Sequence, residues 1–343
     1  MARGGDRPRC DRERGRGGAA RVRAARGGPA GGSGVTDGLR SPSRLRRAGC
    51  AQLAGAAPSP AVRDAYAHCA EIARRSGSSF LAAFWLFPRE QRRALHAIYA
   101  FCRLVDDIAD DPALRGDRAM LLERWHEELV DAYRGKARHP VGIALGDAVH
   151  RFQLPEDCFL DLLAGIAADL RGGEVETFAE LEHYCYCVAS TIGLLVCGVR
   201  GLSGQRVRDY AVPLGIAVQL TNVLRDVGED AAAGRVYLAR EDREAFGVAT
   251  ASLRARTRSE PVARLLSLYA ARARERYAQA QRALPRELRR TLRPAQAMGA
   301  IYRELLDALE RRDFPHHGPA LRLSKPRRVA IAARAWLGIG AHA

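Results

Sequence analysis

The chain has 343 residues, 47% of them hydrophobic, which is enough apolar material for one large domain or two ordinary ones. Its eight Cys form no CxxC pair and its nine His no HExxH motif, which argues against a zinc protein or a disulfide scaffold. The formal charge is +16, and no apolar run approaches the roughly 18 residues of a membrane span, so we predict a cytoplasmic protein.

Residues 1–60 carry much of the positive charge, with thirteen Arg, no Lys and four acidic residues. They contain no aromatic side chain and are rich in Gly, Ala and Pro. Such a segment buries too little apolar surface to offset the entropy of ordering it, so we predict a disordered basic extension. Three interpretations stay open: a dispensable extension, an arm that binds nucleic acid or acidic lipid, and a transit peptide. The folded domain is predicted to span residues 61–340.

From residue 61 onward Ala, Leu, Arg and Glu dominate, which predicts helices almost throughout. The predicted helices cover residues 61–75, 89–111, 117–134, 140–151, 155–170, 178–200, 203–232, 259–283, 291–312 and 325–337. Most prolines fall between them, but Pro213 lies inside one and marks a candidate break. We predict an all-α fold, a single large helical bundle.

Four carboxylates lie close together at the end of the predicted helix 89–111. Asp106 and Asp110 are i,i+4 neighbours, as are Asp107 and Asp111. Like charges at this spacing, at the end of a helix that disfavours anions, destabilise it by ~0.2–0.5 kcal/mol per pair. A bound cation would remove that cost.

The same helix predicts an apolar cavity behind the carboxylates. Steps of three and four residues back from Asp106 reach Cys102, Tyr99 and Leu95. A central apolar tunnel with an acidic mouth would suit a long hydrocarbon with a charged head group.

A second acidic face is predicted on the helix 203–232. Asn222, Asp226 and Asp230 stand at i, i+4 and i+8, and the small residues Gly215 and Ala211 continue the line and leave room for a chain. Oxygen ligands without His or Cys select Mg²⁺ or Mn²⁺ over zinc. Either face alone could be a solvated helix surface, but together they could hold a diphosphate through bridging metal ions.

Arginines lie beside both faces. Arg103 is one turn before Asp106, Arg225 precedes Asp226, and Arg235 follows the second face together with Tyr237. Arginine binds phosphate oxygens in a bidentate fashion and keeps its charge. These residues therefore favour a site for a phosphorylated substrate.

The last predicted helix combines basic and apolar side chains. Lys325 and Arg334 alternate with Val329, Trp336 and Leu337. Such a helix either docks on the bundle or makes a peripheral contact with an anionic membrane.

Five segments in this order resemble the squalene/phytoene synthase family. They are Ser76–Phe80, Tyr99–Asp110, Tyr184–Gly193, Gln219–Asp230 followed by Arg235–Leu238, and Ala300–Tyr302. The resemblance implies an isoprenoid synthase fold and Mg²⁺-dependent, head-to-head condensation of two prenyl diphosphates.

The resemblance also implies roles for single residues. The metal ligands would be Asp106, Asp110, Asn222, Asp226 and Asp230. The diphosphate would bind Arg103, Arg225, Arg235 and Tyr237, and the early substrate-binding segment would contribute Ser76, Ser79 and Phe80. The tunnel would be lined by Tyr99, Tyr184, Gln219 and Tyr302, with Tyr184 and Tyr237 counted as catalytic beside the aspartates.

Ser76 and Ser78 stand where many family members carry His and a basic residue. The Ser-Gly-Ser-Ser-Phe form resembles the bacterial hopanoid branch, which makes presqualene diphosphate and squalene from farnesyl diphosphate. Phytoene synthesis from geranylgeranyl diphosphate is the alternative. NADPH use stays open, because reductive members also lack a GxGxxG fingerprint.

Two other classes of protein share part of the pattern. A head-to-tail prenyltransferase or a terpene cyclase should lack the Gly234–Tyr237 run that this chain contains. A non-catalytic, basic helical protein that binds phosphate or nucleic acid would explain the arginines but not two acidic faces. We expect no nucleic acid on the folded domain.

Overall fold

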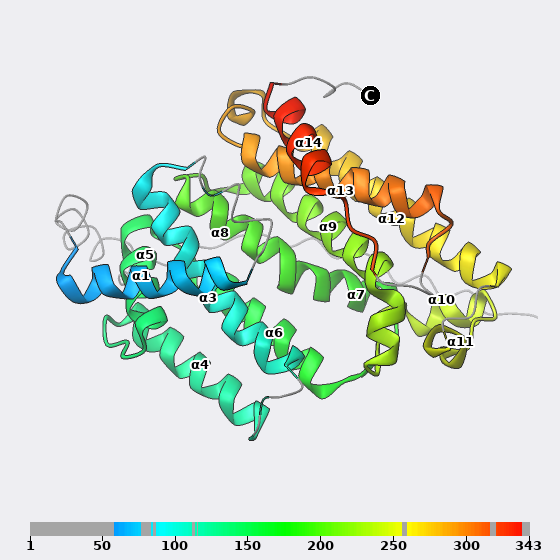
Figure 1. The fold of residues 1–343 in the computed structure, drawn as a ribbon, viewed down its shortest axis with the longest axis horizontal. Coiled ribbons are helices and arrows are strands. Elements are labelled where there is room, and N and C mark those ends of the chain that lie inside the picture. Colours follow the sequence, from blue (N-terminus) through cyan, green and yellow to red (C-terminus); the bar gives the residue numbers. More distant parts are fainter. Residues whose placement is uncertain are drawn as a thin grey trace, which may run out of the picture. The chain divides into compact units, whose positions relative to one another are not determined.

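The computed structural model describes residues 58–76, 84, 87–111, 114, 116–255, 259–315 and 320–337 (Figure 1). The first helices are α1 (Pro60–Arg75), α3 (Arg89–Asp110), α4 (Arg118–Tyr133), α5 (Pro140–Phe152) and α6 (Glu156–Arg171). The central helix consists of α7 (Phe178–Cys185), a π-helical turn η2 (Tyr186–Ser190) and α8 (Thr191–Val199). There follow α9 (Gln205–Ala232), α10 (Arg240–Ala245), α11 (Thr250–Arg254), α12 (Glu260–Ala283), η3 (Arg286–Leu288), α13 (Arg293–Arg311) and α14 (Lys325–Leu337).

This architecture confirms the all-α prediction. All ten predicted helices are present, with ends shifted by a few residues at most. The helices α10 and α11 were not predicted, because each is too short for a helical period to show in the sequence. The candidate break at Pro213 was wrong, since α9 runs through this residue.

Local sequence explains where several helices begin. The side chains of Ser59, Asp117 and Thr177 each accept a hydrogen bond from a backbone N–H in the first turn of α1, α4 and α7. Proline lies in the first turn of α1, α5 and α12, where its missing N–H costs nothing. These signals are local, which is why the sequence predicts the helices well.

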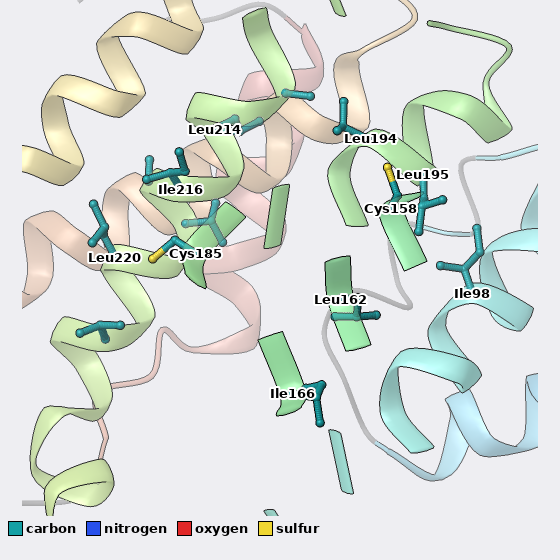
Figure 2. Packing of buried hydrophobic residues seen from close by; sticks show 14 of the residues in the cluster. Ile98, Cys158, Leu162, Ile166, Cys185, Leu194, Leu195, Leu214, Ile216 and Leu220 are labelled. Atoms are coloured by element: carbon teal, nitrogen blue, oxygen red, sulfur yellow. The ribbon is translucent and has the colours of Figure 1, made fainter. Parts of the chain in front are cut away.

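The core is formed by helices that are apolar on several faces. α9 packs against α12, α8, α13 and η2, while α6 packs against η2, α3 and α8. In Figure 2, Leu162 and Ile166 of α6 lie between α3 and α9. α3 and α9, which carry the two acidic faces, therefore lie on either side of the same apolar core.

Glycine allows the central helix to come close to its neighbours. A Cβ atom on Gly215 of α9 would lie 2.5 Å from Ser190 Cα, and one on Gly165 of α6 would lie 2.6 Å from Val188 Cγ1. Gly215 thus serves close packing against η2. This corrects the expectation that Gly215 leaves room for a substrate chain.

A short parallel sheet ties the end of α6 to the segment after α9. β1 (Gly173–Glu174) pairs with β2 (Arg235–Val236), in the register Gly173 to Arg235. Two-residue strands have no periodic signal in the sequence, so this sheet was not predicted.

One stretch of the described residues, Phe178–Val199, is long and apolar enough to cross a membrane by composition alone, in contrast to the expectation from apolar runs. It is the central helix, whose Leu181, Cys185 and Leu195 are fully buried in the bundle. Core packing accounts for its apolar composition.

Candidate active site

The first acidic cluster occupies the last two turns of α3. Asp106 and Asp110 lie one turn apart, and Arg103 pairs with Asp107 and lies 3.5 Å from Asp106 (Nη1 to Oδ2). Burial raises the pKa of Asp106 to about 6, and repulsion from Asp110 adds to this effect. The carboxylates therefore repel one another at a helix end that itself disfavours negative charge.

The second cluster lies on the last turns of α9, which is one continuous helix through Asn222, Asp226 and Asp230. Arg225 binds both carboxylate oxygens of Asp226, with Nε donating to Oδ1 at 2.7 Å. Burial raises the pKa of Asp230 to about 7, and repulsion from Asp226 is the next cause. Arg235, whose Nη2 lies 3.9 Å from Asp230 Oδ1, opposes this rise only in part.

Arg235 joins the two clusters. Its Nη1 donates to Asp110 Oδ1 at 2.7 Å, and its Nη2 lies 3.9 Å from Asp230 Oδ1. One guanidinium therefore reaches a carboxylate of α3 and a carboxylate of α9. The two acidic faces predicted from the sequence thus meet at this guanidinium.

The oxygen atoms at this site fit Mg²⁺ or Mn²⁺. Asn222 Nδ2 donates to Gln219 Oε1 at 3.1 Å, which orients the amide, while the buried Asn222 Oδ1 has no hydrogen-bond partner in the described part of the chain. An unsatisfied buried oxygen is costly, and a hard cation would satisfy it. Among the described residues no three acidic, His or Cys side chains already converge on one point, so phosphate oxygens and water would complete the coordination.

Two tyrosines stack beside the acidic clusters. The rings of Tyr184, at the end of α7, and Tyr237, just after β2, have centroids 4.9 Å apart. Tyr237 donates a hydrogen bond to Asp169 Oδ1 at 2.6 Å, and Tyr184 donates one to Asp169 Oδ2 at 2.9 Å. Burial raises the pKa of both phenols, so both stay protonated.

Asp169, near the end of α6, is the site residue that the sequence analysis missed. Burial raises its pKa, the two tyrosine hydrogen bonds and Arg235 oppose that rise, and the Asp110 charge adds to it. A signal was available, because Asp169 continues the line of Ile166 and Leu162, which are buried. A lone carboxylate on a buried helix face needs polar partners.

The remaining predicted residues lie around this centre. Burial raises the pKa of Tyr302 on α13, whereas Arg225 and Asn222 lower it, so this phenol lies beside the second cluster. Tyr99 is two turns before Asp106 on α3, where its hydroxyl donates to Ser76 Oγ at 2.8 Å. Ser79 and Phe80 lie outside the described residues.

A cavity elsewhere in the bundle does not belong to this site. It has a volume of about 630 Å³ and lies between the first turns of α9, around Arg208 and Pro213, and the end of α12, around Arg282. It shares no residue with either acidic cluster.

The site combines cations, acidic oxygens and buried phenols around an apolar bundle. Arginines can hold a diphosphate, and divalent ions held by the carboxylates can neutralise a diphosphate that leaves with an electron pair. These properties define a prenyltransferase of the all-α type. The chain belongs to the squalene/phytoene synthase family, whose sequence model matches residues 73–332.

Individual relatives agree with this assignment. Phytoene synthase of Arthrospira platensis is 35% identical over 270 residues, covering 74% of this chain and 87% of the relative. Squalene synthase HpnC of Alicyclobacillus acidocaldarius superimposes with a TM-score of 0.69 and 30% identity, covering 78% of this chain and 99% of that one. A dehydrosqualene synthase solved with a ligand gives a TM-score of 0.72 and 29% identity, covering 82% and 98%.

The protein is therefore an enzyme that transfers prenyl groups, and it condenses prenyl diphosphates head to head. The family assignment excludes the three alternative classes considered from the sequence: a head-to-tail prenyltransferase, a terpene cyclase and a non-catalytic binding protein.

Proposed function

We propose that the enzyme condenses two farnesyl diphosphates to presqualene diphosphate, with Mg²⁺ or Mn²⁺ held by Asp106, Asp110, Asn222, Asp226 and Asp230. The main support for this proposal is the position of Arg235, which contacts Asp110 on one acidic face and lies near Asp230 on the other. Both acidic faces therefore lie beside one cationic side chain that can bind phosphate. Divalent ions held by these residues would neutralise the negative charge that develops on the departing diphosphate.

The side chains of this chain supply the other requirements. Arg103, Arg225 and Arg235 hold the diphosphate while the C–O bond breaks and its electron pair leaves with the phosphate oxygen. The double bond of the second substrate attacks the allylic cation, and a proton is lost as the cyclopropane closes. The apolar core around the site excludes water, which would quench the cation.

The Tyr184–Tyr237–Asp169 group is our candidate for receiving that proton. Its two hydroxyls lie 3.2 Å apart and both donate to Asp169, whose pKa is raised by burial, so a proton passed through a phenol has an acceptor. The departing diphosphate is the alternative acceptor.

The choice of farnesyl diphosphate is supported by Tyr99. This bulky side chain lies two turns below Asp106, fixed by Ser76 and by edge-to-face contact with Phe84 at 6.4 Å, and should limit how deep a chain can extend. HpnC is named a squalene synthase, whereas the Arthrospira relative is named a phytoene synthase, so geranylgeranyl diphosphate is the alternative substrate.

A competition experiment tests the substrate. The purified enzyme is given equal farnesyl and geranylgeranyl diphosphate with Mg²⁺, and the products are identified by mass spectrometry, with and without NADPH. We expect presqualene diphosphate without NADPH, and squalene only if the enzyme uses this reductant. Phytoene as the main product would overturn the substrate assignment and leave the head-to-head chemistry intact.

The metal assignment has its own test. Turnover should cease in EDTA and return with Mg²⁺, and Asp226→Asn should remove most activity while the circular dichroism stays helical. Full turnover of a chelated, metal-free preparation would refute the metal ligands.

We further propose that α14 places this cytoplasmic enzyme on an anionic membrane. Of the three large hydrophobic side chains exposed among the described residues, two lie on α14, where Val329 is 68% and Leu337 69% exposed. Lys325 and Arg334 flank them, which suits an acidic lipid surface. α14 also packs on α13 (Figure 1). Docking on the bundle and contact with a membrane would then use different faces of this helix.

Vesicle sedimentation tests this contact. Val329→Glu should reduce binding to vesicles of phosphatidylglycerol and phosphatidylcholine, and binding to pure phosphatidylcholine should be weak. Met120→Glu, at the third exposed position, is the matched control on α4. Equal binding by Val329→Glu and the unaltered protein would show that α14 does not contact the membrane.

A further inference from the structure

The helix α10 begins three residues after Tyr237 and contains a buried charge of each sign. Asp242 is 8% and Arg243 4% exposed, and no other charged residue in the described part of the chain is buried to this degree. Burial of charge is expensive, and hydrophobic replacements often stabilise as well or better. Stability alone therefore explains these two residues poorly.

Arg243 links the backbone after Tyr237 to β1. Its Nε donates to the carbonyl oxygen of Leu238 at 3.0 Å, and its Nη1 to Thr250 Oγ1 at 2.6 Å. Its Nη2 binds Glu174, whose other oxygen accepts from Thr250 Oγ1 at 2.7 Å. Each of the three nitrogens of this guanidinium therefore has a hydrogen-bond partner.

Asp242 fixes the N–H side of the same Leu238–Ala239 peptide group through a tyrosine. Tyr269 accepts a hydrogen bond from the backbone N–H of Ala239 at 2.7 Å and donates to Asp242 Oδ2 at 2.8 Å. Arg272 completes the pair, with Nη2 donating to Asp242 Oδ1 at 2.9 Å.

Hydrogen bonds hold the backbone on both sides of Tyr237 along the chain. Before it, Val236 is paired with β1, and Val175 N–H donates to the Val236 carbonyl oxygen at 3.3 Å. After it, Leu238 and Ala239 are held by Arg243 and Tyr269. Because β1 follows directly after α6, Glu174 also connects this backbone to the helix that carries Asp169.

We infer that Glu174, Arg243 and Asp242 are positioning residues, here called the α10 clamp, which hold Tyr237 against Asp169 for the proton transfer. The inference rests on the proposed role of Tyr237. In the described part of the chain, none of the three makes a side-chain hydrogen bond or ion pair with Asp169, Tyr184 or Tyr237, so their effect on turnover passes through the backbone at Leu238 and Ala239.

The closing test is a double-mutant cycle on kcat. Glu174→Gln removes the charge that holds Arg243 and should lower kcat about tenfold or more while KM changes little, because a displaced catalytic group loses rate and not affinity. In a Tyr237→Phe enzyme the same substitution should have less than about a twofold effect, because the group that it positions is already missing. Thr250→Val removes the hydroxyl bonds to Glu174 and to Arg243 but keeps their ion pair, and should give the same pattern more weakly.

Glu176→Gln is the matched control. Glu176 lies two residues after Glu174 and pairs with Arg240 of α10. That ion pair is exposed and makes no contact with the backbone at Leu238. It should leave kcat and the melting temperature unchanged.

Three results would overturn the clamp. The first is that Glu174→Gln lowers kcat by the same factor in the unaltered enzyme and in the Tyr237→Phe enzyme. The second is that Glu176→Gln lowers kcat as much as Glu174→Gln does. The third is a loss of activity in Glu174→Gln and Thr250→Val that follows only the fraction unfolded in thermal melts. A Tyr237→Phe enzyme with full kcat would instead refute the proposed role of Tyr237, and this is visible before any clamp variant is made.

Discussion

Replacing Asp230 by Asn should stabilise the metal-free protein while it abolishes turnover. Burial and the Asp226 charge raise the pKa of Asp230 from 3.8 to about 7. At ~1.4 kcal/mol per pH unit, ionising this group in the fold costs at most about 4 kcal/mol. The pKa of about 7 already includes the opposing effect of Arg235, and the side chain is 20% exposed, so solvent screening reduces the gain from its removal. We expect a net stabilisation of about 1–2 kcal/mol at pH 8.

Urea unfolding in EDTA between pH 4 and pH 8.5 measures this effect. Because the pKa of Asp230 is higher in the fold than in the unfolded chain, its contribution to stability is present below about pH 4 and is lost as the pH rises through about 7. The difference in unfolding free energy between Asp230→Asn and the unaltered protein should therefore grow over this interval and stay level above it. In thermal melts, ~1 kcal/mol corresponds to a gain of about 2–4 °C.

Asp209→Asn provides the control, since it removes the same charge from α9 outside the acidic cluster. Mg²⁺ with inorganic diphosphate should stabilise the unaltered protein more than Asp230→Asn, because the variant has lost a ligand. The reasoning is refuted if Asp230→Asn is less stable than the unaltered protein at pH 8 in EDTA. It is equally refuted if the difference between the two proteins does not depend on pH.

Three further predictions concern other parts of the molecule. Asp169→Asn should lower kcat about 100-fold with little change in KM, because the amide of Asn still accepts a hydrogen bond but cannot take up the proton; a change in KM alone would argue against proton transfer there. Gly215→Ala should cost about 1–3 kcal/mol in urea unfolding, because its Cβ would meet the Ser190 backbone, whereas Gly193→Ala, 3.8 Å from its nearest neighbour, should be tolerated. A protein that starts at Ala61 should keep its helical circular dichroism and turnover, since residues 1–60 contain no aromatic side chain; loss of activity would assign that segment a role.

The sequence predicts the helices and their polar faces because both depend on neighbours within a few residues. Asn222, Asp226 and Asp230 fall on one line of a helix at any packing, and the same holds for Asp106 and Asp110. The order of the motifs was also sufficient for the family, which the comparison over residues 73–332 confirms.

Sequence spacing is less informative about which residues of different helices contact one another. Gly215 was expected to leave room for substrate, but it lies against the Ser190 backbone. The sequence does not show this, because the neighbouring helix determines what a small residue contacts. In the sequence, Asp169 is an ordinary carboxylate near a helix end. Its place in the site follows from the hydrogen bonds that it accepts from Tyr184 and Tyr237.

By itself, the sequence determined the all-α class, the two acidic helix faces and the arginines beside them, since helical periodicity is a local property of the chain. Only the tertiary structure decided that Arg235 spans the two faces, that Asp169 joins Tyr184 and Tyr237, and that α10 secures the backbone around Tyr237. These contacts join residues from separate helices and strands. Their formation depends on how buried surfaces pack together, and the spacing of residues along one helix carries no record of that packing.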